Sequence, residues 1–271
     1  MLEIFQYDFM QNAFIVGLIL AILGPIIGVF LIIRRYTMIS DTLSHTSLTG
    51  VIIGLISGYS PIIITLIYSI FSALIIEKLR LTKKLTGDMV LALFLSLNLA
   101  IVATILSLNS KVMLNISAYL FGSIALVSIE DVYIISIIGG IIFIILFFIR
   151  NSLLKTTYDE DNALSSGINT KLVNIIFIII VAMLITLAIP ITGILLLSAL
   201  IILPVIVSIQ ISWSFKSTII IAEIVSILSV FFGIIISYFF NISTSGMITF
   251  LLLGFFIIFF LGKKIKIILS K

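Results

Sequence analysis

Long runs of apolar residues dominate this chain, and short polar stretches separate them. Residues 137–149 and 175–189 are almost entirely apolar. Strands of a membrane barrel alternate apolar and polar residues over about ten positions, whereas these runs are continuous. A segment inside a bilayer must also satisfy its own backbone hydrogen bonds. The pattern therefore predicts membrane-spanning helices.

Hydropathy and the positions of helix-breaking residues together predict nine spans. The seventh is short for a bilayer, starts after Pro190-Ile-Thr-Gly193 and contains Pro204, so we expect it to be broken or tilted. The fold class is then all-α, a single polytopic transmembrane bundle of eight or nine spans over residues 1–271. The expected spans are 13–33, 38–57, 61–79, 88–108, 131–149, 172–189, 193–210, 216–239 and 246–262.

Composition supports the membrane assignment and excludes several kinds of protein. Hydrophobic residues make up 62 % of the chain and charged residues 10 %, against about 25 % charged residues in soluble domains. Cysteine is absent, which excludes disulfides, thiolate metal sites and catalytic cysteines. The sequence contains no Gly-x-x-x-x-Gly-Lys-Ser/Thr phosphate loop, no His-Glu-x-x-His and no Gly-x-Ser-x-Gly. We therefore expect no enzymatic activity.

Basic residues fall almost entirely on one side of the predicted bundle. Of the 15 lysines and arginines, only Lys111 is expected on the other side. Loops rich in Lys and Arg face the cytoplasm, which predicts a plasma-membrane protein with its N-terminus outside and its C-terminus inside. The net charge of +4 thus reflects topology in a lipid bilayer and does not indicate nucleic-acid binding.

A polar segment at about 155–170 interrupts the hydrophobic pattern on the basic side. It contains Tyr158-Asp-Glu-Asp-Asn-Ala-Leu-Ser-Ser-Gly-Ile168. The acidic residues suit the positive end of a short helix, and Gly167 suits its C-terminal end. We therefore expect a short amphipathic helix here.

Asp41 and His45, at the start of the second span, are the best candidates for chemistry. They stand four residues apart, so they share one face of a helix. A carboxylate with an imidazole suits zinc, manganese or ferrous iron, and ionisable groups inside a membrane often mark a transport path. A structural role is the alternative: Asp41 would complement the helix dipole, and His45 would be a hydrogen-bonded core side chain.

Small and amide residues are predicted to hold the helices together. Gly50, Gly54 and Gly58 repeat every four residues along the second span, and small residues at this spacing let two helices approach closely. Gly50 lies roughly opposite Asp41 on the helix, so one face packs while the other is left for a cavity. Asn98 and Asn174 are expected to form hydrogen bonds between helices.

Five stretches of the chain resemble the bacterial zinc- and manganese-uptake permeases of ATP-binding-cassette (ABC) transporters, the ZnuB- and MntB-like group. The most specific part reads Asp-Thr-Leu-Ser-His at 41–45, where the family typically has Asp-Ala-Leu-Ser-His, so Thr42 replaces an alanine. The resemblance extends over nearly the whole chain. The stretches are Phe9–Gly17, Arg34–Gly50, Ala118–Ser123, Asp159–Ile168 and Gly193–Pro204.

The resemblance implies a permease with the fold of a type II ABC importer, and it names the partners. These are a cytoplasmic ATPase dimer, an extracytoplasmic metal-binding protein and a second permease copy. No cofactor is expected to stay bound, and the transported ion would be zinc or manganese, with iron also possible. In the family, the aspartate and histidine of the motif are implicated in metal coordination; here they are Asp41 and His45. The residues implied to dock on the ATPase as a coupling helix are Asp159, Glu160, Asp161, Ala163, Leu164 and Gly167.

Two other classes of membrane protein are considered. A proton-coupled secondary metal transporter would need several carboxylates inside the membrane for a proton relay, and this chain has few. A non-transporting membrane scaffold is the third class. An Asp–His pair suits zinc, manganese and ferrous iron alike, and pairing of two identical copies or of two paralogues would both complete the permease.

Overall fold

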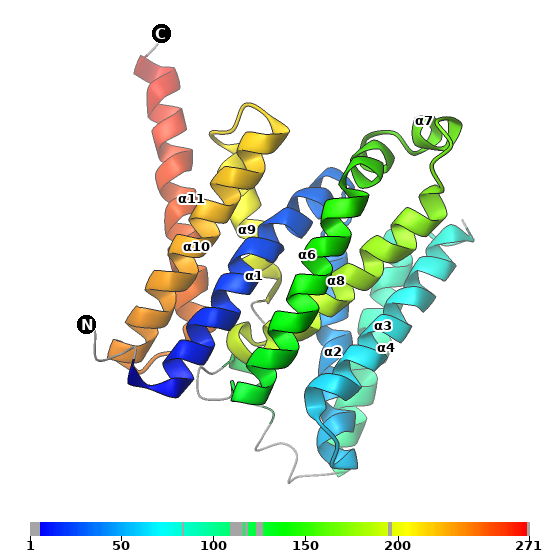
Figure 1. Cartoon of the computed structure of the whole chain (residues 1–271), viewed down its shortest axis with the longest axis vertical. Helices are drawn as coiled ribbons and strands as arrows, with labels where there is room; N and C mark the ends of the chain where they lie inside the picture. Colours follow the sequence, from blue (N-terminus) through cyan, green and yellow to red (C-terminus); the bar gives the residue numbers. More distant parts are fainter. Residues whose placement is uncertain are drawn as a thin grey trace.

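Helices make up the regular structure of the described chain. The computed structural model describes residues 6–82, 84–108, 116, 119–122, 127–194 and 197–269. Within these ranges there are α-helices and no strands, which confirms the all-α prediction (Figure 1). The helices are α1 (Asp8–Ile33), α2 (Met38–Ser57), α3 (Pro61–Leu81), α4 (Gly87–Leu108), α6 (Ile129–Tyr158), α7 (Glu160–Ser165), α8 (Thr170–Thr192), α9 (Leu197–Ile209), α10 (Phe215–Phe240) and α11 (Thr244–Leu269).

Eight of the described helices are long and apolar enough to cross a membrane. The remaining apolar helix, α9, has 13 residues and contains Pro204, so the seventh expected span is short, as predicted. Helix α6 is longer than predicted and continues from Ile129 to Tyr158. The predicted span ended at 149 because Arg150 is charged, but no helix-breaking residue follows until Asp159, which caps the next helix.

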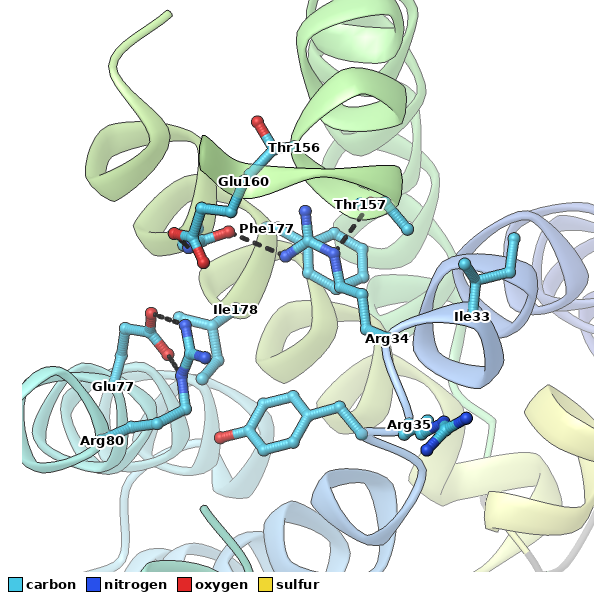
Figure 2. A pocket seen from close by; sticks show the side chains of 12 residues that line it. Ile33, Arg34, Arg35, Glu77, Arg80, Thr156, Thr157, Glu160, Phe177 and Ile178 are labelled. Atoms are coloured by element: carbon cyan, nitrogen blue, oxygen red, sulfur yellow. Dashed lines mark hydrogen bonds and ion pairs between the residues drawn. The ribbon is translucent and has the colours of Figure 1, made fainter. Parts of the chain in front are cut away.

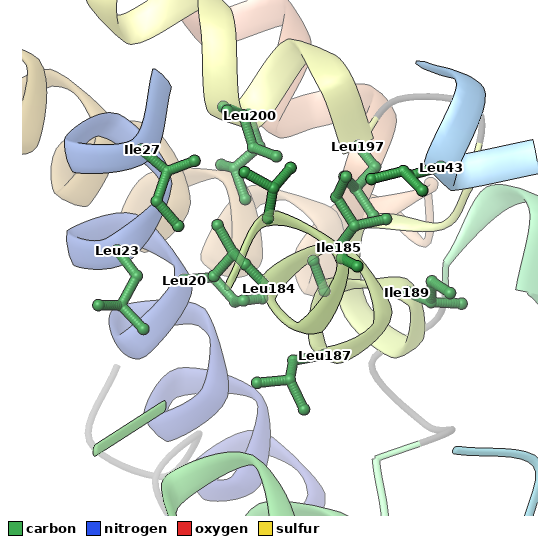
Figure 3. Close-up of a cluster of buried hydrophobic side chains, with 14 of the residues drawn as sticks. Leu20, Leu23, Ile27, Leu43, Leu184, Ile185, Leu187, Ile189, Leu197 and Leu200 are labelled. Atoms are coloured by element: carbon green, nitrogen blue, oxygen red, sulfur yellow. The ribbon is translucent and has the colours of Figure 1, made fainter. Parts of the chain in front are cut away.

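The buried core lies where α8 crosses α1 and α9. Figure 3 shows leucine and isoleucine side chains from these three helices packed together, with Leu43 of α2 at the edge. Helix α8 is 72 % buried along its most apolar stretch, whereas the corresponding stretch of α11 is 17 % buried. Helix α8 therefore lies inside the bundle, as does α2 with the same buried share, and α11 lies at the periphery.

The two ends of the bundle differ in chemistry. In Figure 1, α1 begins at the lower end, α11 ends at the upper end, and α7 lies at the upper end. The turn between α1 and α2 also lies at the upper end, because Arg34 contacts the end of α6. This upper end, which carries Arg34, Arg80, Arg150 and Lys155, is called the basic end below.

Helix α2 packs closely on α3 through two of its three glycines. A Cβ atom on Gly50 would lie 2.7 Å from the Cα of Thr65, and one on Gly54 would lie 2.7 Å from the Cα of Pro61. The third glycine has a different role. Gly58 caps the C-terminus of α2 with φ of +74°, and nothing lies within 4 Å of the position of its Cβ. The close approach of α2 and α3 therefore depends on Gly50 and Gly54.

Candidate functional site

Helix α2 is rich in hydroxyl side chains, yet most of it is buried. Its hydroxyls satisfy themselves locally: Ser44 donates to the carbonyl of Ser40 at 2.6 Å, and Thr46 donates to the carbonyl of Thr42 at 2.8 Å. Such bonds to the preceding turn allow a polar residue to be buried without another partner. The Asn98 amide of α4 also donates to the Thr46 hydroxyl of α2 at 3.1 Å, which confirms that Asn98 forms a hydrogen bond between helices.

Asp41 and His45 differ from these hydroxyls because they have no hydrogen-bond partner. Both side chains are half-buried, and they are close enough to interact electrostatically. Among the described residues, the Asp41 carboxylate forms no hydrogen bond or ion pair, and the buried Nδ1 of His45 has no partner. A buried polar atom without a partner is rare in a native fold and calls for an explanation.

The pair does not complete a metal site within one chain. In the part of the chain that the structure describes, no three His, Cys, Asp or Glu side chains come close enough to hold an ion. A rise of about 1.5 Å per residue places His45 about 10 Å along α2 from its start. The pair therefore lies in about the third of α2 nearest the basic end. Other groups would have to supply the remaining ligands of a metal ion.

The short helix predicted at the basic end is present as α7. Asp159 caps it, with its carboxylate accepting a hydrogen bond from the Asn162 backbone at 2.9 Å. Gly167 follows the helix with φ of +81°. Ala163 is buried, whereas Leu164 is 58 % exposed. One face of α7 thus packs on the bundle, and the other presents an apolar side chain to the outside.

A partly buried network joins α7 to the start of α2, and the sequence did not predict it. Arg34 donates from Nε to the Thr157 hydroxyl and from Nη1 to Oδ1 of Asn174, both at 2.8 Å. The Asn174 amide then donates to the Glu160 carboxylate at 3.0 Å. The guanidinium also lies over the Phe177 ring, 4.8 Å from its centroid. Figure 2 shows the Arg34 side chain beside Thr157 and Phe177, with Glu160 nearby.

A second charged pair lies beside this network. Arg80 and the buried Glu77 form two hydrogen bonds, of 2.6 and 2.9 Å, and Arg80 lies 5.6 Å from the centre of the Tyr36 ring. Together the two groups line a cavity of about 300 Å³. Burial, with a smaller effect of Arg80, lowers the pKa of Arg34 to about 10, so it remains a cation at neutral pH.

Tyr36 and Arg34 each keep one buried atom without a hydrogen-bond partner, the Tyr36 hydroxyl and Arg34 Nη2. Burial and, secondarily, the Glu77 carboxylate raise the pKa of Tyr36 above its usual value, so this hydroxyl stays protonated. Among the described residues the network is therefore charged, partly buried and not fully satisfied. A buried polar atom without a partner is energetically unfavourable.

The turn that carries Arg34 is strained at its next residue. Arg35 has φ of +54°, a left-handed conformation that suits glycine. The Tyr36 amide donates to the Leu31 carbonyl at 2.9 Å, and the Arg35 amide donates to the Ile32 carbonyl at 3.0 Å. These two bonds form a Schellman motif with arginine at the glycine position. The bonds hold a tight reversal directly before α2.

The sequence and the structure identify different parts of this region. The Asn174 prediction is confirmed, since its side chain connects α8 to both Arg34 and Glu160. Arg34 and Arg80 were interpreted from sequence only as topology signals. Arg34 opens the second family-like stretch, and that position was the one signal in the sequence that could have singled it out.

Comparison with known proteins gives consistent matches over most of the chain. A family model described as "ABC 3 transport family" matches residues 6–263. A "Probable metal transport system membrane protein" of Treponema pallidum is 34 % identical over 241 residues, which cover 89 % of this chain and 90 % of that protein. The high-affinity zinc uptake system membrane protein ZnuB of Buchnera aphidicola subsp. Acyrthosiphon pisum is 32 % identical over 241 residues, 89 % of this chain and 92 % of that one.

A solved structure has a similar fold. The structure described as PsaBC from Streptococcus pneumoniae in complex with Fab superimposes with a TM-score of 0.82 and 25 % sequence identity. The match covers 94 % of this chain and 91 % of the chain in that structure. The arrangement of helices in Figure 1 is therefore shared with the PsaBC structure over nearly the full length of both chains.

Proposed function

Because the chain belongs to the ABC 3 transport family, we propose that it is the membrane-spanning permease of an ABC importer for a divalent transition metal ion. The relatives whose names mention metal or zinc uptake support the choice of substrate. The observation that carries the proposal is the Asp41–His45 pair, whose polar atoms have no hydrogen-bond partner among the described residues. The chain itself is not an enzyme, and a partner ATPase hydrolyses the ATP.

Asp41 and His45 would act by replacing water around the ion. A divalent cation loses hydration as it enters the bundle, which is unfavourable unless protein ligands compensate. A carboxylate oxygen and an imidazole nitrogen suit zinc, manganese and ferrous iron. Binding must also be weak enough for the ion to leave. A site with two ligands per chain therefore suits an ion in transit better than an ion that stays permanently bound.

A second permease copy is proposed to complete the site. Asp41 and His45 are half-exposed in the single chain, and one chain gives no third ligand of their kind among its described residues. Oligomers are commonly symmetric, so that the same patch of both copies meets at the axis. Two such pairs facing each other would supply four ligands. An extracytoplasmic metal-binding protein would deliver the ion to the opposite end of the permease.

The basic end is proposed to face the cytoplasm, where the ATPase dimer docks on α7. This orientation follows from the rule that Lys- and Arg-rich loops stay inside, and it places the N-terminus outside and the C-terminus inside. The exposed Leu164 and the acidic residues Asp159 and Asp161 would contact the ATPase, while Ala163 packs inward. Glu160 would pass the movement on through its bond to Asn174.

The Arg34 network would connect ATP hydrolysis to the metal ligands. Arg34 lies between α7 and α2, and Asp41 follows it by seven positions in the chain. A shift of α7 would pull on Asn174 and Arg34 and so move the turn that begins α2. A connected network of this kind can transmit a switch between two packings. The atoms left unsatisfied here would gain partners in the other conformation.

His45→Ala tests the proposal in proteoliposomes containing the permease, its ATPase and its binding protein. We expect uptake at limiting metal to fall to background while the complex still assembles. Thr42→Ala is the matched control, because it changes the same turn of α2 to the residue typical of the family, and its uptake should stay normal. Normal uptake by the His45 variant would contradict the assigned site.

Two further readouts separate the proposal from its alternatives. Uptake should require ATP and stop with vanadate; uptake driven by a proton gradient without ATP would instead indicate a secondary transporter. Competition among zinc, manganese and ferrous iron for uptake by the reconstituted complex would identify the preferred ion, which the Asp–His pair leaves open.

A further inference from the structure

An apolar groove runs along the outside of the bundle towards its basic end. It lies between α1, α6 and α10, and Figure 1 shows α1 lying between the other two helices. Its volume of about 450 Å³ falls within the range of about 300–1,000 Å³ that is typical of ligand sites. The groove is lined by Ile26, Phe30, Phe143, Leu146, Phe147, Arg150, Asn151, Leu154, Phe215, Lys216 and Ile219.

Two cations stand at one end of this groove. Arg150 lies on α6 and Lys216 is in the first turn of α10, and both side chains are exposed. Arg150 is held over the Phe147 ring, 4.7 Å from its centroid, which fixes the guanidinium next to the apolar lining. Asn151 adds an amide beside the cations. The groove therefore has an apolar body with a positively charged, hydrogen-bonding head.

The charge of the groove is not compensated by the protein. Among the described residues, neither Arg150 nor Lys216 forms an ion pair, and no described residue that lines the groove is acidic. The neighbouring cavity around Arg34 is the opposite case, because Glu77 and Glu160 lie beside its arginines. Both cavities are at the same end of the bundle, so position alone does not explain the difference. Of these two cavities, the groove is the one whose described lining has cations and no carboxylate, so its charge suits an external anion.

We propose that this groove binds an anionic phospholipid from the leaflet at the basic end of the bundle. An acyl chain would lie along Phe143, Leu146 and Ile219, and the phosphate would contact Arg150 and Lys216. Basic pockets between membrane helices on the cytoplasmic side suit lipid headgroups of this kind. A protein partner would have to bring both an apolar segment and a negative charge into the membrane, whereas one phospholipid carries both.

Native mass spectrometry of the detergent-purified permease complex tests this assignment. The complex is titrated with dioleoyl phosphatidylglycerol and, separately, with dioleoyl phosphatidylcholine. We expect phosphatidylglycerol to bind at saturable sites and phosphatidylcholine to bind far more weakly. The double variant Arg150→Gln with Lys216→Gln should bind phosphatidylglycerol about 30-fold more weakly, since each cation near a membrane surface contributes about fivefold.

A charge-matched control and a groove-filling variant distinguish this site from general surface attraction. Lys78→Gln with Lys84→Gln removes two exposed cations from the same end of the bundle, away from the groove, and should leave lipid binding unchanged. Ile219→Trp keeps both cations and fills the groove, and it should weaken phosphatidylglycerol binding about tenfold. It also tests the groove if the double variant fails to fold.

Two results would overturn the proposal. One is equal retention of both lipids, or an equal loss in the groove variant and the Lys78/Lys84 control, since either would assign the binding to nonspecific annular lipid. The other is a complex that retains no phosphatidylglycerol while the groove variants change its oligomeric mass, since that would assign the groove to a second protein copy. Neither result depends on metal uptake, so the test is separate from that of the proposed function.

Discussion

Two regions only seven positions apart, the Arg34 network and the Asp41–His45 pair, use charged groups in opposite ways. Arg34 donates hydrogen bonds to α6 and α8, and Asn174 links it to Glu160 of α7. Asp41 and His45 are half-exposed on α2 and have no hydrogen bond among the described residues. Two of the three Arg34 side-chain nitrogens thus bond neighbouring helices together, whereas the proposed metal ligands have no such bonds. This contrast predicts that substitutions in the two regions will differ in their effects on stability and on metal uptake.

The largest expected effect comes from Asp41→Asn, which removes the charged ligand and keeps the shape of the side chain. We expect metal uptake to fall about 100-fold, because even the outer partners of metal ligands are worth ~10–100-fold in affinity. The thermal unfolding temperature of the purified permease should not change, because the Asp41 carboxylate forms no hydrogen bond or ion pair with a described residue. A clear loss of stability would show that Asp41 is a structural residue and would remove the contrast.

Arg34→Met should have a smaller effect on uptake and a larger effect on stability. It leaves Asn174 and Thr157 without their donor, and hydrogen bonds to charged groups contribute roughly 1.5–3 kcal/mol each. Because two such bonds are lost, we expect the free energy of unfolding to fall by about 3 kcal/mol or more. Uptake per ATP should fall about tenfold while the ATPase stays active, since coupling networks carry roughly 0.5–2 kcal/mol.

Arg35→Met is the matched control for this prediction. It removes the same charge one position away, from an exposed side chain, and it keeps a non-glycine residue at the left-handed position. Its uptake and stability should both resemble those of the unmodified protein. If Arg34→Met lowers uptake and ATP hydrolysis in the same proportion, the ratio of metal to ATP is unchanged and Arg34 does not act in coupling.

The same contrast explains how much could be predicted from the sequence. The spans follow from local hydropathy, and the shared face of Asp41 and His45 follows from their spacing of four residues. The network does not follow from any local pattern, because Arg34 meets Asn174 across 140 positions. The sign of its charge grouped Arg34 with the other basic residues at one end of the predicted bundle. It carried no information on which of them would be buried.

The glycines of α2 show the same limit on a smaller scale. The spacing of four residues predicted one role for Gly50, Gly54 and Gly58, but spacing alone does not show where the neighbouring helix ends. Helix α3 begins at Pro61, so Gly54 meets its first residue, and Gly58 lies in the connection and ends α2. To predict which glycine makes a close contact, one must therefore know where the neighbouring helix begins as well as where the small residues lie.

The smallest expected effect concerns the back of α2, where the helix that carries Asp41 and His45 packs against α3. In Gly50→Ala the new methyl group would lie 2.7 Å from the Cα of Thr65, a backbone atom that cannot rotate away. Overpacking of this kind costs about 1–3 kcal/mol, so we expect the unfolding temperature to fall. Uptake should fall only about two- to threefold, because the ligands and the network both remain.

Gly140→Ala on α6 is the control for Gly50→Ala, because it should change the unfolding temperature in the opposite direction. Gly140 is exposed, and nothing lies within 4 Å of the position of its Cβ. Alanine there should stabilise the helix by roughly 0.5–1 kcal/mol, so identical substitutions should shift the unfolding temperature in opposite directions. If both variants are equally stable, α2 and α3 can separate without penalty. The proposed movement of the α1–α2 turn would then shift α2 without shifting α3. A shift of α7 would act on α2 alone.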